Sequence, residues 1–300
     1  MAQSLCAATI PVADSIQNAV DLAKPGDVLQ LNGPTVFHEH VKITKAIELR
    51  GVNNAVIDAD ATGSPLTIEA EGVQVSGITV RNSGADLGVP DCGILVRASK
   101  TTIKNVRVEG GGFGIYLRAS DNCQIADNII IGNTNVPSAK RGNGIHLWKS
   151  KNNIITGNEV YGSRDGMYFS YADQNIIASN RVEQTRFGIH YMYSHRNQLR
   201  GNTLTANSVG AALMFARDCV VEENRAFANR RHGILLKQVE TSRFVRNAVY
   251  GQNRGFFIQQ AALTGKLSPK IEWMLHAMPH STDANVNSAM QVSRTRLRPK

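Results

Sequence analysis

Three side chains of the sequence, His190, Met192 and Met214, place one imidazole and two thioethers at a spacing that suits a soft metal ion. His190 and Met192 are two residues apart, so on a strand they share one face with roughly 7 Å between their Cα atoms. Met214 would lie beside Met192 at roughly 4.8 Å if the two occupy neighbouring coils of a repeat. Thioether sulfur suits Cu(I), whereas Mg²⁺ and Ca²⁺ prefer clustered carboxylates. The spacing predicts a copper site that binds Cu(I) transiently.

Other histidines are near enough in the repeat to contribute to this site, namely His146, His195 and His232. The competing interpretation is that Met192 and Met214 cover a hydrophobic docking surface, as methionine does at adaptable interfaces. The residue types alone leave metal binding and docking open.

A repeat of about 22 residues has to position these side chains. Each repeat begins with a glycine and an alternating apolar phrase, and the steps between glycines are 21, 30, 22, 22, 22, 23 and 22 residues. Further apolar residues follow at eleven and sixteen positions after the glycine, so each repeat holds three short strands. A period this regular, without the leucine frame of leucine-rich repeats, indicates a solenoid. The glycines are Gly93, Gly114, Gly144, Gly166, Gly188, Gly210, Gly233 and Gly255.

An asparagine stands fourteen positions after most of these glycines, as in Asn158, Asn180 and Asn202. Asparagine accepts left-handed backbone angles and can hydrogen-bond to the asparagine of the next coil, so a polar ladder is expected at this turn. The predicted fold class is all-β: a right-handed parallel β-helix, with coils roughly 4.8 Å apart. Residues in positions two and four after each glycine should face outward, and that face is unusually rich in aromatic, His and Met side chains, as expected of an interaction site.

The ends of the repeat define three segments. Residues 1–10 are expected to be a leader remnant or disordered, residues 11–260 a single β-helix domain, and residues 261–300 an atypical tail. Asp14 can cap a short helix that plugs the first coil. His38 and His40 share a strand face in the early coils, where two exposed histidines near a turn are the simpler interpretation. The long step of 30 residues maps to a loop at residues 132–142.

Composition agrees with one elongated domain: 300 residues, of which 42% are hydrophobic. The net charge of +9 is diffuse, and no Lys/Arg run is interleaved with stacking aromatics, which argues against nucleic-acid binding. The four cysteines form no Cys-x-x-Cys pair and do not identify the compartment. No apolar run approaches the roughly 18 residues of a membrane span.

Three phrases of the sequence resemble the NosD family, whose members are periplasmic maturation proteins of nitrous oxide reductase. They lie at residues 141–148, 164–170 and 186–195, and the resemblance extends from about Ile10 to Ile258. It implies a non-enzymatic right-handed β-helix, related in fold to carbohydrate-binding and sugar-hydrolase solenoids. The resemblance also implies partners: an ABC transporter permease and ATPase, a membrane-attached copper chaperone as donor, and nitrous oxide reductase as the copper acceptor. It gives no ligand list.

The resemblance ends after Gln260. The next glycine of the repeat is due near position 277, where Ala277 stands, and residues 261–300 carry no asparagine column. The tail is therefore expected to be truncated or frame-shifted sequence.

The alternative function is a β-helix polysaccharide lyase or epimerase acting on acidic sugars. Such enzymes need an acid and a base, and often a Ca²⁺ site built from several carboxylates on one face. The outward columns show no such cluster; Asp165 is the best acidic candidate, but it precedes Gly166 at a turn and can simply tie down that corner. A third interpretation, a passive adhesin-like scaffold, requires no site.

Overall fold

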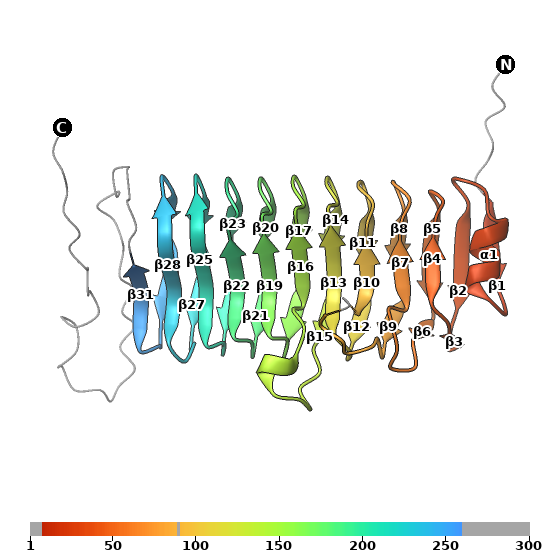
Figure 1. Ribbon diagram of the computed structural model, residues 1–300, viewed down its shortest axis with the longest axis horizontal. Coiled ribbons are helices and arrows are strands. Elements are labelled where there is room, and N and C mark those ends of the chain that lie inside the picture. The colour runs from red at the N-terminus through yellow and green to blue at the C-terminus, as the bar shows by residue number, and fades with distance from the viewer. Residues whose placement is uncertain (1–7, 89–90, 260–300) are drawn as a thin grey trace, which may run out of the picture.

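The computed structural model describes residues 8–88 and 91–259 as one parallel β-helix, with the coils stacked along its long axis (Figure 1). Each regular coil contributes one strand to each of three parallel sheets, so every strand pairs with its counterparts in the neighbouring coils. The predicted right-handed, all-β class is confirmed. Of the described helices, none is long and apolar enough to cross a membrane.

The first sheet has 11 strands. They are β1 (Thr9–Val12), β2 (Val28–Asn32), β5 (Glu48–Val52), β8 (Gln74–Ser76), β11 (Thr102–Lys104), β14 (Gln124–Ala126), β17 (Ile154–Thr156), β20 (Ile176–Ala178), β23 (Gln198–Arg200), β26 (Val220–Glu222) and β29 (Arg243–Val245). The second sheet has 10 strands. They are β3 (Val36–His38), β6 (Val56–Asp58), β9 (Thr79–Arg81), β12 (Arg107–Glu109), β15 (Ile129–Ile131), β18 (Glu159–Tyr161), β21 (Arg181–Glu183), β24 (Thr203–Thr205), β27 (Arg225–Phe227) and β30 (Ala248–Tyr250).

The third sheet, also of 10 strands, carries the repeat glycines and the predicted site. It consists of β4 (Val41–Ile43), β7 (Leu66–Ile68), β10 (Cys92–Val96), β13 (Phe113–Arg118), β16 (Ile145–Trp148), β19 (Asp165–Ser170), β22 (Phe187–Met192), β25 (Val209–Arg217), β28 (His232–Glu240) and β31 (Arg254–Gln259).

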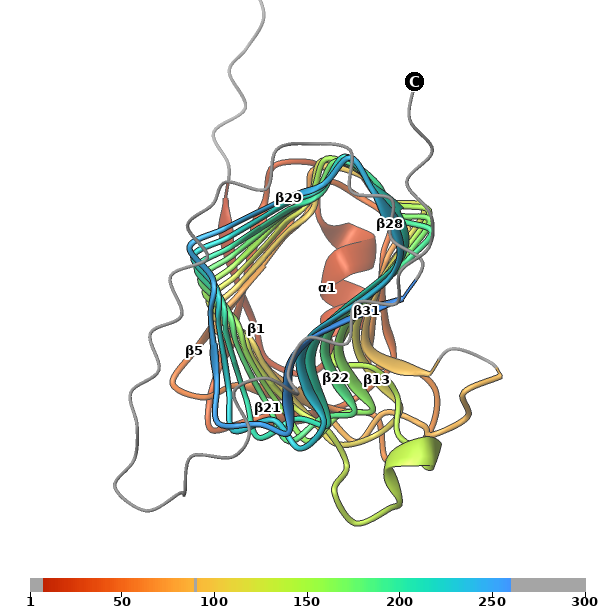
Figure 2. The same cartoon turned by 90° about the vertical axis from the view of Figure 1, so that its left-hand side faces the viewer.

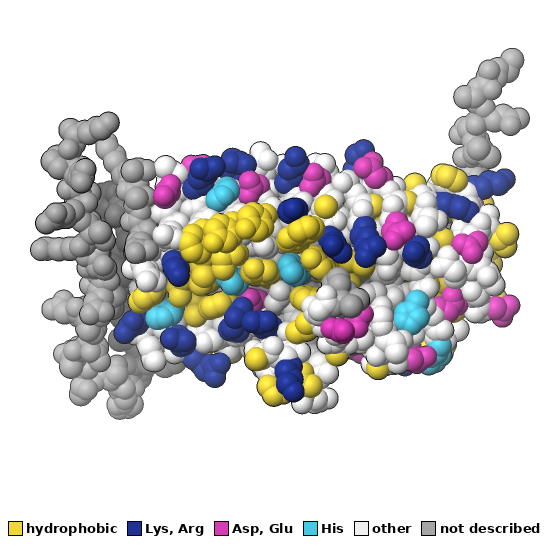
Figure 3. Space-filling view, viewed as in Figure 1, with side chains coloured by type: hydrophobic (Ala, Val, Ile, Leu, Met, Phe, Trp, Pro, Cys, Tyr) yellow, Lys and Arg dark blue, Asp and Glu magenta, His cyan; other side chains and the backbone are white. Residues whose placement is uncertain are grey.

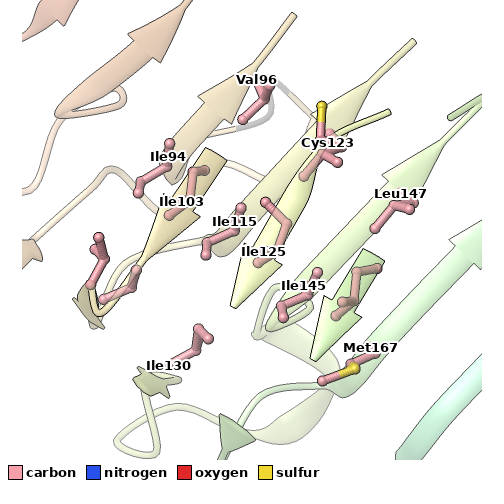
Figure 4. Close-up of a cluster of buried hydrophobic side chains, with 14 of the residues drawn as sticks. Ile94, Val96, Ile103, Ile115, Cys123, Ile125, Ile130, Ile145, Leu147 and Met167 are labelled. Atoms are coloured by element: carbon pink, nitrogen blue, oxygen red, sulfur yellow. The ribbon is translucent and has the colours of Figure 1, made fainter. Parts of the chain in front are cut away.

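The interior is built from rows of equivalent apolar residues. Ile145, Met167 and Ile189 pair in register on successive strands and are fully buried, as the period predicts. Figure 4 shows Ile145 and Met167 among the buried side chains of the core. Glycine precedes these residues for reasons of space: a Cβ on Gly166 would lie 2.1 Å from Val182 Cγ1 and 2.6 Å from the carbonyl oxygen of Gly188. The glycine therefore leaves room for a β21 side chain of the same coil and for the backbone of the next coil.

The asparagine ladder is present and buried. The side-chain amide of Asn158 donates to Asn180 Oδ1 at 3.0 Å, and that of Asn180 donates to Asn202 Oδ1 at 2.9 Å. The left-handed residue, however, is the one before each asparagine, as in Ser179 (φ 56°) and Gly201 (φ 60°). The expectation that the asparagine itself takes these angles is wrong, because its side chain is needed inside the coil to satisfy backbone groups.

Two further polar ladders were not predicted. One runs through Asn153, Asn175 and Asn197, and the other joins Asn207 to Asn229. Cys123 continues the first of these columns and is a buried free thiol; burial raises the pKa of Cys123 to about 11. Its role is that of a small core residue.

A short helix, α1 (Ile16–Leu22), closes the N-terminal end of the solenoid, as predicted (Figure 2). Ile16 and Val20 bury their side chains against the first coils. The N-cap is Ser15, whose side chain accepts a hydrogen bond from Asn18 N at 3.2 Å, in place of the predicted Asp14. Glu39 accepts hydrogen bonds from two further helical N–H groups, which an N-terminal carboxylate does favourably.

The loop at residues 132–142 contains the 3₁₀ helix η1 (Ser138–Lys140) and projects from one corner of the solenoid (Figures 1 and 2). Arg141 holds it by donating to the carbonyl oxygens of Val136, Gly162 and Thr134.

The segment boundaries predicted at residues 10 and 260 stay predictions, and the tail at 261–300 lies outside the described residues. β1 begins at Thr9.

Replacing Asn180 with Ala should destabilise the protein more than a single lost contact would. Asn180 Oδ1 accepts from both the backbone and side-chain nitrogens of Asn158, and its amide donates to the Ile155 carbonyl oxygen at 2.9 Å. Each buried group left unpaired costs about 1–3 kcal/mol. Urea unfolding should therefore show a loss of at least about 2 kcal/mol. The exposed loop variant Asn135→Ala is the control and should change stability by less than about 0.5 kcal/mol; equal effects would show that the ladder is dispensable.

Candidate functional site

The outer face of the third sheet gathers hydrophobic side chains over β19, β22 and β25, with Lys and Arg side chains around them (Figure 3). The exposed members are Tyr171 and Tyr193, and Met192, Met214 and Phe215 are half-buried. An apolar patch of this kind on a water-facing sheet is typical of an interaction site. The predicted aromatic and Met-rich face is therefore present.

The residues two positions after the glycines form a packed aromatic row. The rings of Tyr116 and His146 stack with centroids 4.3 Å apart, and Tyr168 lies 4.9 Å from His146 on one side and 4.9 Å from His190 on the other. This column was predicted to face outward, but several of its side chains are not exposed to solvent: Leu95 is 5% exposed, His190 is 4% exposed and Ala212 is fully buried. Strand spacing brings equivalent rings into contact, so each ring covers its neighbours.

His190 is held by a buried charged group. Its Nδ1 lies 2.9 Å from Asp165 Oδ2, and Arg186 binds both oxygens of the same carboxylate, each at 2.7 Å. Burial alone would raise the pKa of Asp165, but hydrogen bonds from His190 and Arg186 outweigh it and hold this pKa below its usual value. The hydrogen bond to Asp165 in turn raises the pKa of Arg186. His190 Nε2 is closed off from solvent and has no hydrogen-bond partner among the described residues.

Met192 and Met214 lie side by side, because β22 and β25 pair in register at these two residues. The same register puts Ala212 next to His190, which lies two residues before Met192 on β22. The strands thus bring together the three residues predicted as a copper site, with one imidazole and two adjacent thioethers on one face. Thioethers are soft donors and imidazole is a borderline one, and His190 Nε2 is buried without a hydrogen-bond partner among the described residues.

His146 does not join this group. The Tyr168 ring lies between it and His190, and the two histidines belong to strands separated by β19. Both ring nitrogens of His146 are buried without a partner among the described residues. Burial lowers the pKa of His146 to about 4, with a small opposing effect of Asp165.

His195 lies in a separate hollow of about 360 Å³, to which neither Met192 nor Met214 contributes. Burial lowers the pKa of His195. The hollow is lined by Tyr193, His195, Phe215, Ala216, Arg217, Gln238 and Glu240. Of the five predicted ligands, His190, Met192 and Met214 are therefore neighbours, and His146 and His195 are apart from them.

A ladder of aromatic rings beside the methionines was missed in the sequence. Tyr171, Tyr193 and Phe215 stack with centroids 5.3 and 4.6 Å apart, and all three have left-handed backbone angles, with φ of 51–55°. The same left-handed angle recurs at this position in other coils, at Ala119, Lys149 and Gln238, so it belongs to the turn of the repeat. The ring faces cover one another, and the Lys237 ammonium lies over Phe215 at 5.6 Å. The available signal was an aromatic five positions after the glycine in three successive repeats.

A second cluster of metal-ligating types lies far from this face, at His38, Asp58 and Asp60. Its donor atoms lie within 4.8 Å of one another. Asp58, however, already accepts hydrogen bonds from Arg81 at 2.6 Å and from the Asn82 amide. Because Arg81 neutralises that carboxylate, we interpret these ion pairs as structural contacts that stabilise a turn of the solenoid. His38 is an exposed histidine near a turn, as the sequence indicated.

These features define a class: a parallel β-helix protein whose outer sheet face carries a hydrophobic patch with buried histidine and paired methionines. Residues 30–139 and 135–267 match the family described as "Periplasmic copper-binding protein (NosD)", and the chain belongs to this family. The resemblance seen in the three sequence phrases is thereby confirmed.

Two curated relatives carry the name "Probable ABC transporter binding protein NosD". The one from Stutzerimonas stutzeri is 45% identical over 71% of this chain, and the one from Pseudomonas aeruginosa is 39% identical over 41% of it. The matched regions span 49% and 29% of those relatives, so the chain covers about half of their length or less.

Solved structures with the same fold are more distant in sequence. The tailspike protein 2 of an Escherichia coli O157:H7 bacteriophage aligns with a TM-score of 0.67 at 12% identity, over 82% of this chain and 39% of the tailspike. The Streptococcus pneumoniae adhesin PfbA aligns with a TM-score of 0.59 at 14% identity, over 84% and 96% of the two chains. The periplasmic alginate epimerase AlgG aligns with a TM-score of 0.53 at 13% identity, over 86% and 84%. At these identities the likeness shows the fold alone.

The burial of His146 predicts a pH-dependent stability. Its pKa is about 4 in the folded state and 6.5 when unperturbed, so between these values the unfolded chain binds a proton that the folded chain does not. Stability should fall as the pH drops from 6.5 towards 4, by about 1–2 kcal/mol at pH 5 from this residue. His146→Phe keeps an aromatic ring in the row and should flatten the dependence of the melting temperature on pH.

Tyr116→Phe is the matched control, since it alters the same ring stack without removing an imidazole, and it should leave the pH dependence unchanged. His195 and His232 have pKa values lowered by burial as well, so a reduced slope will remain in His146→Phe. An NMR titration that places the His146 midpoint near the unperturbed 6.5 would contradict the prediction.

Proposed function

We propose that this chain forms the copper-handling β-helix of a periplasmic accessory protein, which works with an ABC transporter to supply copper for nitrous oxide reductase. The observation that carries the proposal is the group of His190, Met192 and Met214 on one sheet face, with His190 Nε2 unpartnered among the described residues. Support comes from the family description, which names copper and the periplasm, and from relatives named as ABC transporter binding proteins.

The partners in this proposal are those that the family resemblance implies. An ABC permease and ATPase would work with the protein, a membrane-attached copper chaperone would donate the ion, and nitrous oxide reductase would receive it. We do not include nucleic acid among the partners, because several cations on this face are engaged in cation–π contacts or ion pairs. Lys149 lies over Trp148 at 4.6 Å, and Arg186 pairs with Asp165.

The donor set fits Cu(I) as cargo. Two thioethers and one imidazole are soft or borderline ligands, and the neighbouring strands offer no clustered carboxylates that would favour Mg²⁺ or Ca²⁺. Three ligands would leave a coordination position free for exchange, unlike a closed four-coordinate site. Because His190 Nε2 is closed off from solvent, an ion must displace covering side chains to reach it. Methionine, with its flexible thioether chain, permits such movement.

A polysaccharide lyase or epimerase remains the second candidate, because the fold also occurs in an alginate epimerase. Two features argue against it. Asp165, the best acidic candidate, is 1% exposed and neutralised by Arg186, which makes it a poor base. The stacking of Tyr171, Tyr193 and Phe215 covers both faces of the middle ring, Tyr193, which leaves less open aromatic face for a sugar ring to stack on. We therefore assign no enzymatic activity.

Replacing Met192 and Met214 with Leu tests the thioether pair. Leucine keeps the size and apolarity of these half-buried positions and removes both sulfur atoms, so the double variant should fold normally. Competition with a chromophoric Cu(I) chelator under reducing conditions should show an affinity at least about tenfold weaker, equivalent to about 1.4 kcal/mol.

Met167→Leu is the matched control, because it removes a thioether that points into the core and should leave Cu(I) affinity unchanged. If the double variant binds Cu(I) as tightly as the parent, the methionine pair is docking surface and the site is elsewhere. Cleavage of a uronate polymer by the parent protein, followed by absorbance of the unsaturated product, would instead support the enzyme.

A further inference from the structure

The contact between Asp165 and His190 determines which ring nitrogen can bind a ligand. Arg186 Nε donates to Asp165 Oδ1 and Arg186 Nη2 donates to Oδ2, each at 2.7 Å. This two-pronged guanidinium contact requires an ionised carboxylate, which accepts hydrogen bonds and cannot donate them. The 2.9 Å contact between Asp165 Oδ2 and His190 Nδ1 is therefore a hydrogen bond only when Nδ1 carries the proton.

Packing fixes the orientation of the same imidazole. The ring of Phe187 meets it edge-on with centroids 4.7 Å apart, and the ring of Tyr168 lies 4.9 Å away. Arg186 lies over the Phe187 ring at 4.6 Å, so one guanidinium contacts both the carboxylate and the ring that support His190. The imidazole is thus held by its Nδ1 edge and by two neighbouring rings, and Nε2 is the remaining nitrogen.

Two histidines in the same column allow an internal comparison. His146 has the same place in its coil and also packs against aromatic rings, Tyr116 and Tyr168, yet neither of its nitrogens has a hydrogen-bond partner among the described residues. His190 has one satisfied nitrogen and one unsatisfied nitrogen. A buried nitrogen without a hydrogen-bond partner costs free energy. Ring packing alone does not explain why the Asp165 carboxylate, paired with Arg186, contacts His190 and not His146.

We propose that Asp165 is a positioning residue: it keeps His190 in the Nδ1–H form, so that the Nε2 lone pair is available to a soft metal ion beside Met192 and Met214. A carboxylate that orients a ligating histidine in this way also raises the basicity of the ligand nitrogen. The identity of the ion rests on the proposed function. The assignment of the tautomer rests on the Asp165, Arg186 and His190 contacts alone.

The first experiment needs no substitution. In protein labelled with ¹⁵N at histidine, two-bond ¹H–¹⁵N correlation spectra at neutral pH should show His190 protonated at Nδ1 and bare at Nε2. A parent protein with the proton on Nε2 would overturn the inference.

The second experiment replaces Asp165 with Asn, which has nearly the same shape. Its one carbonyl oxygen should be retained by Arg186, so the amide nitrogen would face His190 Nδ1 and donate to it, which moves the ring proton to Nε2. Cu(I) affinity should fall about 10–100-fold, as is usual when a partner of a ligating histidine is lost. An Asp165→Asn protein that keeps the Nδ1–H signal and the parent affinity would overturn the positioning role.

Asp173→Asn is the matched control. Asp173 also pairs with an arginine of the next coil, Arg196 at 2.8 Å, but its other partner is the backbone N–H of His195 rather than a ring nitrogen. This variant should leave both the His190 signals and Cu(I) affinity unchanged.

The outcomes separate the two proposals. A parent protein with His190 in the Nδ1–H form and no affinity for Cu(I) would refute the proposed function and leave the tautomer assignment intact. Equal losses of affinity in Asp165→Asn and Asp173→Asn would show a general effect of charge and refute the specific role of Asp165.

Discussion

The hydrogen bonds between successive coils are the constraint on which the rest of this structure depends. They hold neighbouring strands at the fixed separation of a parallel sheet, roughly 4.8 Å, so residues in equivalent positions of the repeat must touch. A residue type is therefore tolerated only if it packs against itself or against its counterpart one coil away. Ile145, Met167 and Ile189 satisfy this in the core by apolar contact, and Asn158, Asn180 and Asn202 satisfy it by amide hydrogen bonds.

The same spacing acts on the outer face, where it converts a list of aromatic residues into two packed rows. Rings at the spacing of strands cover one another, which explains why His190 is buried on a surface that the strand alternation turns outward. It also places opposite charges of successive coils within reach, as in Asp165 with Arg186 and Asp173 with Arg196. The positions of the side chains on this face are thus set largely by the spacing of the coils.

The period of the repeat carries the information for the rows of equivalent residues, although the second asparagine ladder and the Tyr171, Tyr193 and Phe215 row were missed. The glycine phrase, the asparagine column and the pairing of Met192 with Met214 follow from counting, because register in this fold is set by the length of the repeat. The sequence does not predict contacts between side chains at different positions of the repeat, because these depend on the direction of each side chain. The contact of Asp165 with His190 joins two columns and two coils, and the left-handed angle lies one residue before the asparagine rather than on it. Ser15 capped the helix instead of Asp14 because only the final backbone geometry decides which side chain reaches the free N–H groups.

The fold also limits how tightly a site on this face can hold an ion. The Cα positions of His190, Met192 and Met214 are set by strand pairing on both sides, since β22 lies between β19 and β25. The backbone cannot close around a ligand without breaking ladder hydrogen bonds that continue through the neighbouring coils. Only side-chain rotation is available to complete coordination, and the thioether chains provide it at the cost of their own rotamer freedom. In the proposed site, an imidazole held by Asp165 would combine one oriented donor with two flexible thioether chains. Such a combination would favour capture and release over permanent retention, because the repeat fixes the backbone and leaves only the side chains free to adjust.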